Sequence, residues 1–70
     1  MVLTENHKDM IGILKCLGAE DSTIIPAMVA LQDDEKAGEV LDRILDLEDK
    51  GEEVTLQVVL KLIVEVNEKS

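Results

Sequence analysis

The chain has 70 residues, of which 46% are hydrophobic and none is aromatic, and its 16 acidic and 7 basic residues give a net charge of −9. This balance excludes direct binding to nucleic acid or to an anionic membrane surface, because both depend on Lys and Arg meeting phosphate. No apolar run approaches the roughly 20 residues that span a bilayer, and residues 1–10 lack the pattern of a secretory signal. We therefore expect a cytoplasmic protein.

A chain this short forms a single domain, residues 1–70, with a small core. Small domains are usually stabilised by disulfides, a metal or oligomerisation. The only cysteine, Cys16, and the only histidine, His7, cannot form an intrachain disulfide or supply the roughly four ligands of a structural zinc site. We therefore predict a homo-oligomer, with a dimer favoured, and no cofactor or metal.

The first predicted helix covers about residues 5–17. Thr4 is a suitable N-cap, and Gly18 can take the positive φ that ends a helix. Apolar side chains share one face of this helix, namely Met10, Ile13, Leu14 and Leu17. We expect His7, at the edge of that face, to be a partly buried packing residue and Cys16 to lie at the surface.

The second predicted helix covers about residues 23–31, with Ser22 or Thr23 as its cap and Pro26 tolerated near its first turn. This segment has no polar face, and a helix of that kind is buried or lies at an interface. We assign self-association to Ile25, Met28 and Val29.

The third predicted helix covers about residues 34–50, between a cap at Asp33 or Asp34 and an end at Gly51. Its apolar arc consists of Ala37, Val40, Leu41, Ile44, Leu45 and Leu47. Its other face carries an acidic ridge formed by Glu35, Glu39, Asp42, Asp46 and Asp49. Like charges at this spacing repel by a few tenths of a kcal/mol, and the Glu39–Arg43 and Asp46–Lys50 pairs should relieve part of that repulsion.

The acidic ridge has two interpretations. It can be a solvated face that keeps an apolar chain in solution, or a docking surface for a basic protein partner. In the second case the chain can act as a decoy that imitates the phosphates recognised by a DNA-binding protein. Catalysis by paired carboxylates is not expected, because it requires a cleft that separates their pKa values.

The last segment, VTLQVVLKLIVEV at residues 54–66, has two readings. Its alternation fits a strand, but a strand needs a partner, and no second convincing strand exists in the chain. A helix over about residues 55–68, capped by Thr55, satisfies its own backbone and is favoured. It would carry two apolar stripes, one of Leu56, Val59, Leu60 and Ile63, the other of Val58, Leu62 and Val66. As a helix, the segment would place one stripe in the core and the other against another chain. As a strand, it would pair with its copy in another chain. Both interpretations therefore predict self-association.

The sequence matches no motif for catalysis or metal binding well. His7 and Cys16 lie nine residues apart, about 13 Å along a helix, and on different faces, so they do not form a catalytic pair. Residues 33–44 place Gly38 as a calcium loop requires, but Ala37 and Ile44 occupy ligand positions. We therefore predict that the chain is not an enzyme.

Residues 17–34, LGAEDSTIIPAMVALQDD, resemble the acyl carrier proteins, which are small, acidic and four-helical. In that family a Gly-x-Asp-Ser-Leu motif opens the second helix, and the match to Asp21 and Ser22 implies phosphopantetheine attachment at Ser22. The sequence departs from the motif by the extra Glu20, by Thr23 in place of Leu, and by the lack of a long first loop.

The sequence as a whole predicts an all-α, compact four-helix domain packed as a homodimer. Its expected function is contact with other proteins, as a self-associating regulator or adaptor. The decoy and the acyl-carrier-like protein are the alternatives.

Overall fold

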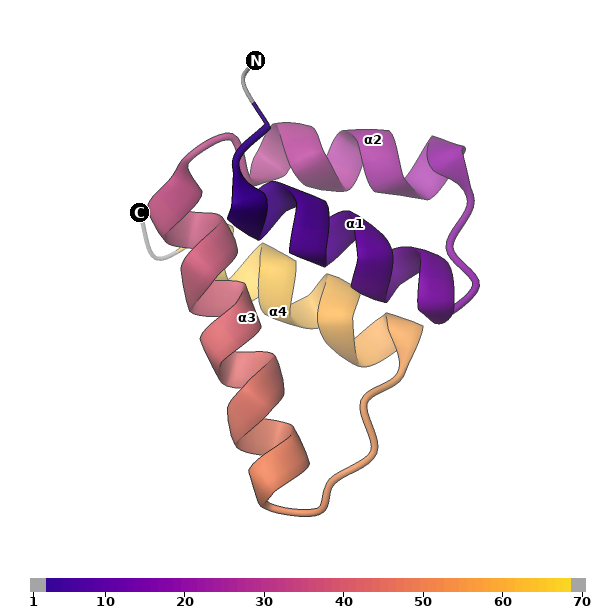
Figure 1. Ribbon diagram of the computed structural model, residues 1–70, viewed down its shortest axis with the longest axis vertical. Coiled ribbons are helices and arrows are strands. Elements are labelled where there is room, and N and C mark those ends of the chain that lie inside the picture. The colour runs from indigo at the N-terminus through magenta and orange to yellow at the C-terminus, as the bar shows by residue number, and fades with distance from the viewer. Residues whose placement is uncertain (1–2, 69–70) are drawn as a thin grey trace.

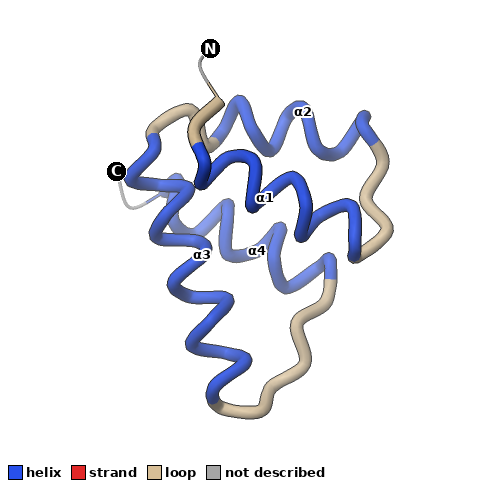
Figure 2. Tube along the Cα trace, viewed as in Figure 1, coloured by secondary structure: helices blue, strands red, loops and turns tan. Residues whose placement is uncertain are grey.

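The protein is described by a computed structural model covering residues 3–68. In this range the chain forms four helices and no strand (Figures 1 and 2): α1 Glu5–Cys16, α2 Asp21–Ala30, α3 Asp34–Asp49 and α4 Leu56–Glu68. The all-α prediction is confirmed, and the ambiguous segment 54–66 becomes a helix from Leu56 onward.

Helix α3 runs transverse to the other helices and passes the start of α1 and the end of α4 (Figure 1). Helix α2 runs antiparallel to α1, and α4 lies on the other side of α1 in that view. The packed pairs are α1 with α2, α1 with α3, α2 with α4, and α3 with α4. The second half of α3 extends beyond the bundle, and the loop of residues 50–55 returns from it to α4 (Figures 1 and 2).

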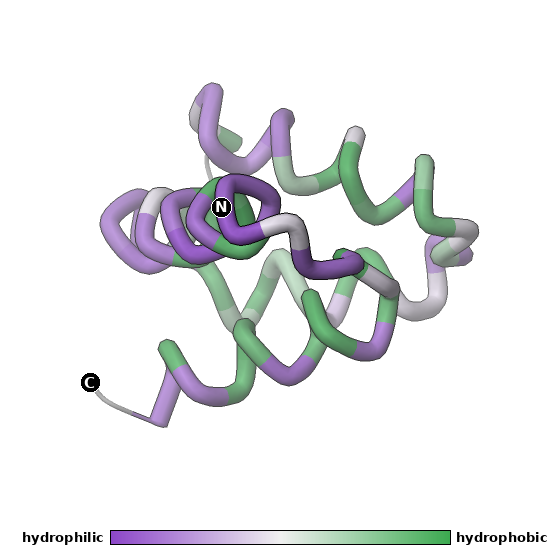
Figure 3. The backbone as a smooth tube through the Cα atoms, turned by 90° about the horizontal axis from the view of Figure 1, so that it is seen from below, coloured by the Kyte–Doolittle hydropathy of each residue, from purple (hydrophilic) through white to green (hydrophobic). Residues whose placement is uncertain are grey.

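The core is built from aliphatic residues and methionine that all four helices and Leu31 contribute. Its buried members are Met10, Leu14, Ile24, Ala27, Met28, Leu31, Ala37, Val40, Ile44, Val59, Ile63 and Val66. Since the chain has no aromatic residue, the flexible side chains of Met10 and Met28 fill irregular space between the helices. Hydrophobic residues dominate α4, whereas α3 is largely hydrophilic (Figure 3).

One corner of the bundle is joined by a polar cluster around His7, whose side chain is fully buried. The Thr4 backbone N–H donates to His7 Nδ1 at 3.1 Å, and the His7 N–H donates to the Thr4 hydroxyl, which together form a capping box. Because Nδ1 is the acceptor, Nε2 carries the hydrogen and donates it to the Leu31 carbonyl at the end of α2. The Thr4 hydroxyl donates to Asp34 Oδ1 at 2.6 Å, at the start of α3.

Polar contacts between described side chains attach helix α4 to α3. Lys36 Nζ donates to Asn67 Oδ1 at 3.1 Å, and Arg43 lies 3.5 Å from the Glu65 carboxylate. The Lys36 contact joins the end of α4 to the first turn of α3. The ends of all four helices therefore meet at the same corner as the His7 cluster.

Two glycines end helices as the sequence predicts. Gly18 has φ +90° and Gly51 has φ +76°. At both ends the N–H of the next residue returns to a carbonyl in the last turn, from Ala19 to Leu14 and from Glu52 to Leu47. This is the Schellman arrangement, which favours glycine because a side chain is strained at positive φ.

The start of α2 differs from the prediction. The helix begins at Asp21, and its N-cap is Glu20, which makes no side-chain capping bond. The Glu20 carbonyl accepts the N–H groups of Thr23 and Ile24, so the helix starts before Ser22 and Thr23 and the predicted cap at either residue is wrong. Pro26 is therefore the sixth residue of the helix and lies beyond its first turn.

The start of α3 also differs. Asp33 occupies the N-cap position without a side-chain capping bond. The Asp34 carboxylate instead accepts bonds from Thr4 and from Asn6 Nδ2, the latter at 3.1 Å. The first turn of α3 is thus tied to α1 through the Asp34 side chain. By contrast, the predicted Thr4 cap is confirmed, and so is the Thr55 cap, where the hydroxyl accepts the Val58 N–H at 3.2 Å.

Replacing His7 tests the importance of the corner. We expect His7→Ala to lower the free energy of unfolding by about 3 kcal/mol, because it removes the capping box and leaves the Leu31 carbonyl without its partner. Urea titration followed by circular dichroism at 222 nm measures this, and the exposed neighbour Lys8→Ala should change it by less than about 0.5 kcal/mol. Equal loss in the two variants would contradict the role assigned to His7.

Candidate functional site

The acidic ridge lies exposed along α3, at all five predicted positions. Both predicted ion pairs are present, Arg43 with Glu39 at 4.0 Å and Lys50 with Asp46 at 3.0 Å. The hydrogen bond and negative charge of Asp46 raise the pKa of the Lys50 amine. The ridge provides an exposed anionic surface with no enclosed acid–base pair.

The residues assigned to self-association differ in burial: some lie in the core, some are half-buried and two are exposed. Met28, Val59, Ile63 and Val66 lie in the chain's own core, and Leu56, Val58, Leu60 and Leu62 are half-buried. The expected open stripe on α4 is absent from the described residues, because α2 and α3 both pack on that helix. Only Ile25 and Val29, at 63% and 58% exposure, remain open on the predicted surface.

Ile25 and Val29 belong to an apolar depression that we call the α2 patch. Its volume is about 300 Å³, and its lining is Leu3, Ile11, Ile24, Ile25, Met28 and Val29. Leu3, just before α1, is 46% exposed. The patch is thus a shallow, wholly apolar surface that joins α2 to the start of the chain and to α1.

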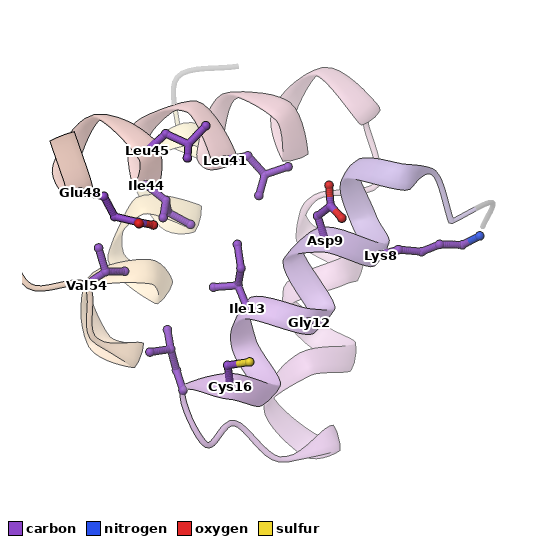
Figure 4. Close-up of a pocket in the computed structure, with 11 residues that line it drawn as sticks. Lys8, Asp9, Gly12, Ile13, Cys16, Leu41, Ile44, Leu45, Glu48 and Val54 are labelled. Carbon is purple, nitrogen blue, oxygen red and sulfur yellow. The ribbon is translucent and has the colours of Figure 1, made fainter.

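A larger depression lies between α1 and the projecting half of α3, and we call it the α1/α3 groove (Figure 4). Its volume is about 720 Å³. The apolar lining residues are Ile13, Leu17, Leu41, Ile44, Leu45 and Val54. The other lining residues are Lys8, Asp9, Gly12, Cys16 and Glu48. The divergence of α3 from α1 leaves this apolar surface uncovered.

The side chains named as chemical candidates lie apart. His7 is buried in the corner cluster, whereas Cys16 is an exposed free thiol. Ser22, the position implied by the acyl carrier resemblance, is the second residue of α2 and is exposed. Among residues 3–68 no group of three His, Cys, Asp or Glu side chains is arranged to hold a metal ion.

None of the helices within residues 3–68 has the length and apolar character needed to cross a bilayer. Comparison with protein-family models, with curated proteins and with solved structures finds no match for this chain. The function of the two apolar surfaces is therefore inferred from their own geometry and charge.

Two apolar side chains, Leu45 and Val64, are more exposed than the sequence pattern indicated. Leu45 was expected in the core arc of α3, yet it is 59% exposed at the rim of the groove. The sequence did place Leu45 at the edge of the apolar arc, beside the acidic ridge, and that position is the pattern from which its exposure could have been predicted. Val64, which no predicted stripe contained, is 54% exposed on α4.

Gly12 offers a test of the rim of the groove, because a Cβ added there would meet nothing within 4 Å. We expect Gly12→Ala to raise the free energy of unfolding by about 0.5–1 kcal/mol, since alanine restricts the unfolded chain and favours helix. The contrasting variant is Gly18→Ala, which should lower it by about 1 kcal/mol because of its positive φ. Destabilisation by Gly12→Ala in urea unfolding would show that this position is packed.

Proposed function

We propose that this protein acts through contacts with other protein chains, without catalysing a reaction, and that its first partner is a second copy of itself across the α2 patch. The observation that supports this is the exposure of Ile25 and Val29 on one face of α2. Residues four apart on a helix are neighbours, so the two side chains form one continuous apolar surface. Exposed apolar patches commonly mark interaction sites.

Charge favours the α2 patch over other faces for contact between two copies. Each chain carries a net charge of −9, so two copies repel. Residues 22–32, however, contain no Asp, Glu, Lys or Arg. Apposition at α2 therefore brings together the longest uncharged segment of the sequence.

The expected assembly is a symmetric dimer, because a two-fold axis lets the same patch serve both chains. Complete burial of an exposed Ile or Val contributes about 1.5–3 kcal/mol. Four such side chains, two from each copy, must also overcome the loss of translational freedom. We therefore expect a reversible dimer with a Kd of about micromolar.

Ile25→Glu tests the dimer by placing a buried charge on each side of the interface. Sedimentation equilibrium should give a dimer for the natural chain at about 100 µM, well above a micromolar Kd, and a monomer for Ile25→Glu. The matched control is Leu45→Glu, an equally exposed apolar residue on α3, which should remain dimeric. A monomeric natural chain at that concentration, or dissociation of the two variants alike, would contradict this interface.

A further inference from the structure

The α1/α3 groove combines an apolar floor with an acidic edge, and we propose that it binds a basic amphipathic helix from a partner protein. This site lies on a different set of residues from the α2 patch, apart from their shared support by α1. The proposal is therefore independent of whether the protein forms a dimer.

The floor of the groove can accept apolar side chains. Ile13 from α1 and Leu41 and Ile44 from α3 point toward the space between the two helices (Figure 4). The volume of about 720 Å³ falls within the roughly 300–1,000 Å³ of typical ligand pockets. Leu41 and Glu48 lie seven residues apart, about 10 Å along α3, so the groove matches two turns of a partner helix that inserts residues at i, i+3 and i+4.

The edge of the groove formed by α3 is anionic. Glu48 lines it directly. Asp42 and Asp49, both exposed members of the acidic ridge, are three residues before and four after Leu45 and therefore flank it on the helix surface. This edge complements a helix that carries Lys or Arg beside its apolar face.

The edge of the groove formed by α1 lets a partner helix approach closely. Gly12 has no side chain there, and a Cβ at that position would meet nothing within 4 Å. Asp9 lies on the side of α1 that faces α3, whereas Lys8, the only basic lining residue, extends away from the groove (Figure 4). The positive charge of Lys8 thus leaves the anionic character of the cavity largely intact.

The same charges argue against other occupants. In each of the four helices the acidic residues equal or outnumber the basic ones, so every helix that a second copy could insert is neutral or net negative. Nucleic acid and anionic lipid carry the same sign of charge as the rim. A basic, amphipathic helix is the occupant whose apolar face and charge both match.

The test uses a fluorescein-labelled helical peptide of Leu and Lys, with Leu at i, i+3, i+4 and i+7, and fluorescence anisotropy as the measurement. Two control peptides have the same length, one with Glu replacing Lys and one with the Leu positions scrambled so that no apolar face forms. We expect binding of the first peptide only. Its affinity should fall as salt rises from about 0.01 to 0.15 M, because the Debye length shortens from about 30 to 8 Å.

Variants locate the site on the protein. Leu45→Glu and the double variant Asp42→Lys with Asp49→Lys should each weaken binding at least about tenfold at low salt, with circular dichroism confirming that they fold. The double variant Glu20→Lys with Glu68→Lys makes the same change in net charge at exposed positions outside the groove and should bind nearly as well as the natural chain. Ile25→Glu should bind the peptide unchanged, which separates this result from the dimer test.

Methyl NMR supplies a direct readout, with the largest peptide-induced shifts expected at Ile13, Leu41, Ile44 and Leu45. Several outcomes would overturn the proposal. Equal binding of the scrambled or acidic peptide would show that no amphipathic basic helix is recognised. Equal weakening by the Glu20 and Glu68 control would show attraction to net charge alone. Loss of dimer in Leu45→Glu, with no peptide binding to the natural chain, would assign the groove to a second copy.

Discussion

The fold depends on the buried His7 side chain and the polar partners that surround it. His7 completes the cap of α1 and donates to the Leu31 carbonyl at the end of α2, while its partner Thr4 donates to Asp34 at the start of α3. Three helix ends are thereby held at one corner by directional bonds. A buried polar group is costly when unpaired, so the buried bond from His7 to the Leu31 carbonyl specifies how α1 meets the end of α2 more strongly than an aliphatic contact would.

The position of that corner explains where apolar surface is left uncovered. The α4 end is also joined there, through Lys36 and Asn67, so α3 is fastened at its first turns and diverges from α1 toward its last ones (Figure 1). In the diverging part, Leu45 has no helix above it and is 59% exposed. Leu41, Leu45 and Val54 consequently line the α1/α3 groove. Stability at one end and an uncovered apolar surface at the other follow from the same geometry.

The acidic surface gives the two apolar sites different characters. The α2 patch lies within an uncharged segment and suits a copy of the same acidic chain, whereas the groove adjoins Asp42, Glu48 and Asp49 and suits a basic partner. Charge thus distinguishes two surfaces that hydrophobicity alone would treat alike. In this view the acidic ridge contributes to partner choice through its position beside the groove.

Local sequence patterns determined the first three helices, the Thr4 and Thr55 caps, the two glycine-terminated ends and the two ion pairs along α3 and at its end, because each depends on residues within a turn of one another. The dual pattern of residues 54–66 left helix and strand open, and the enclosure of α4 by α2 and α3 decided it. Tertiary structure alone decided that His7 is a buried bridge and that Leu45 is exposed. Both outcomes depend on where other helices lie: His7 meets a carbonyl 24 residues away, and Leu45 stays uncovered because α1 and α3 diverge, which no periodicity within either helix encodes.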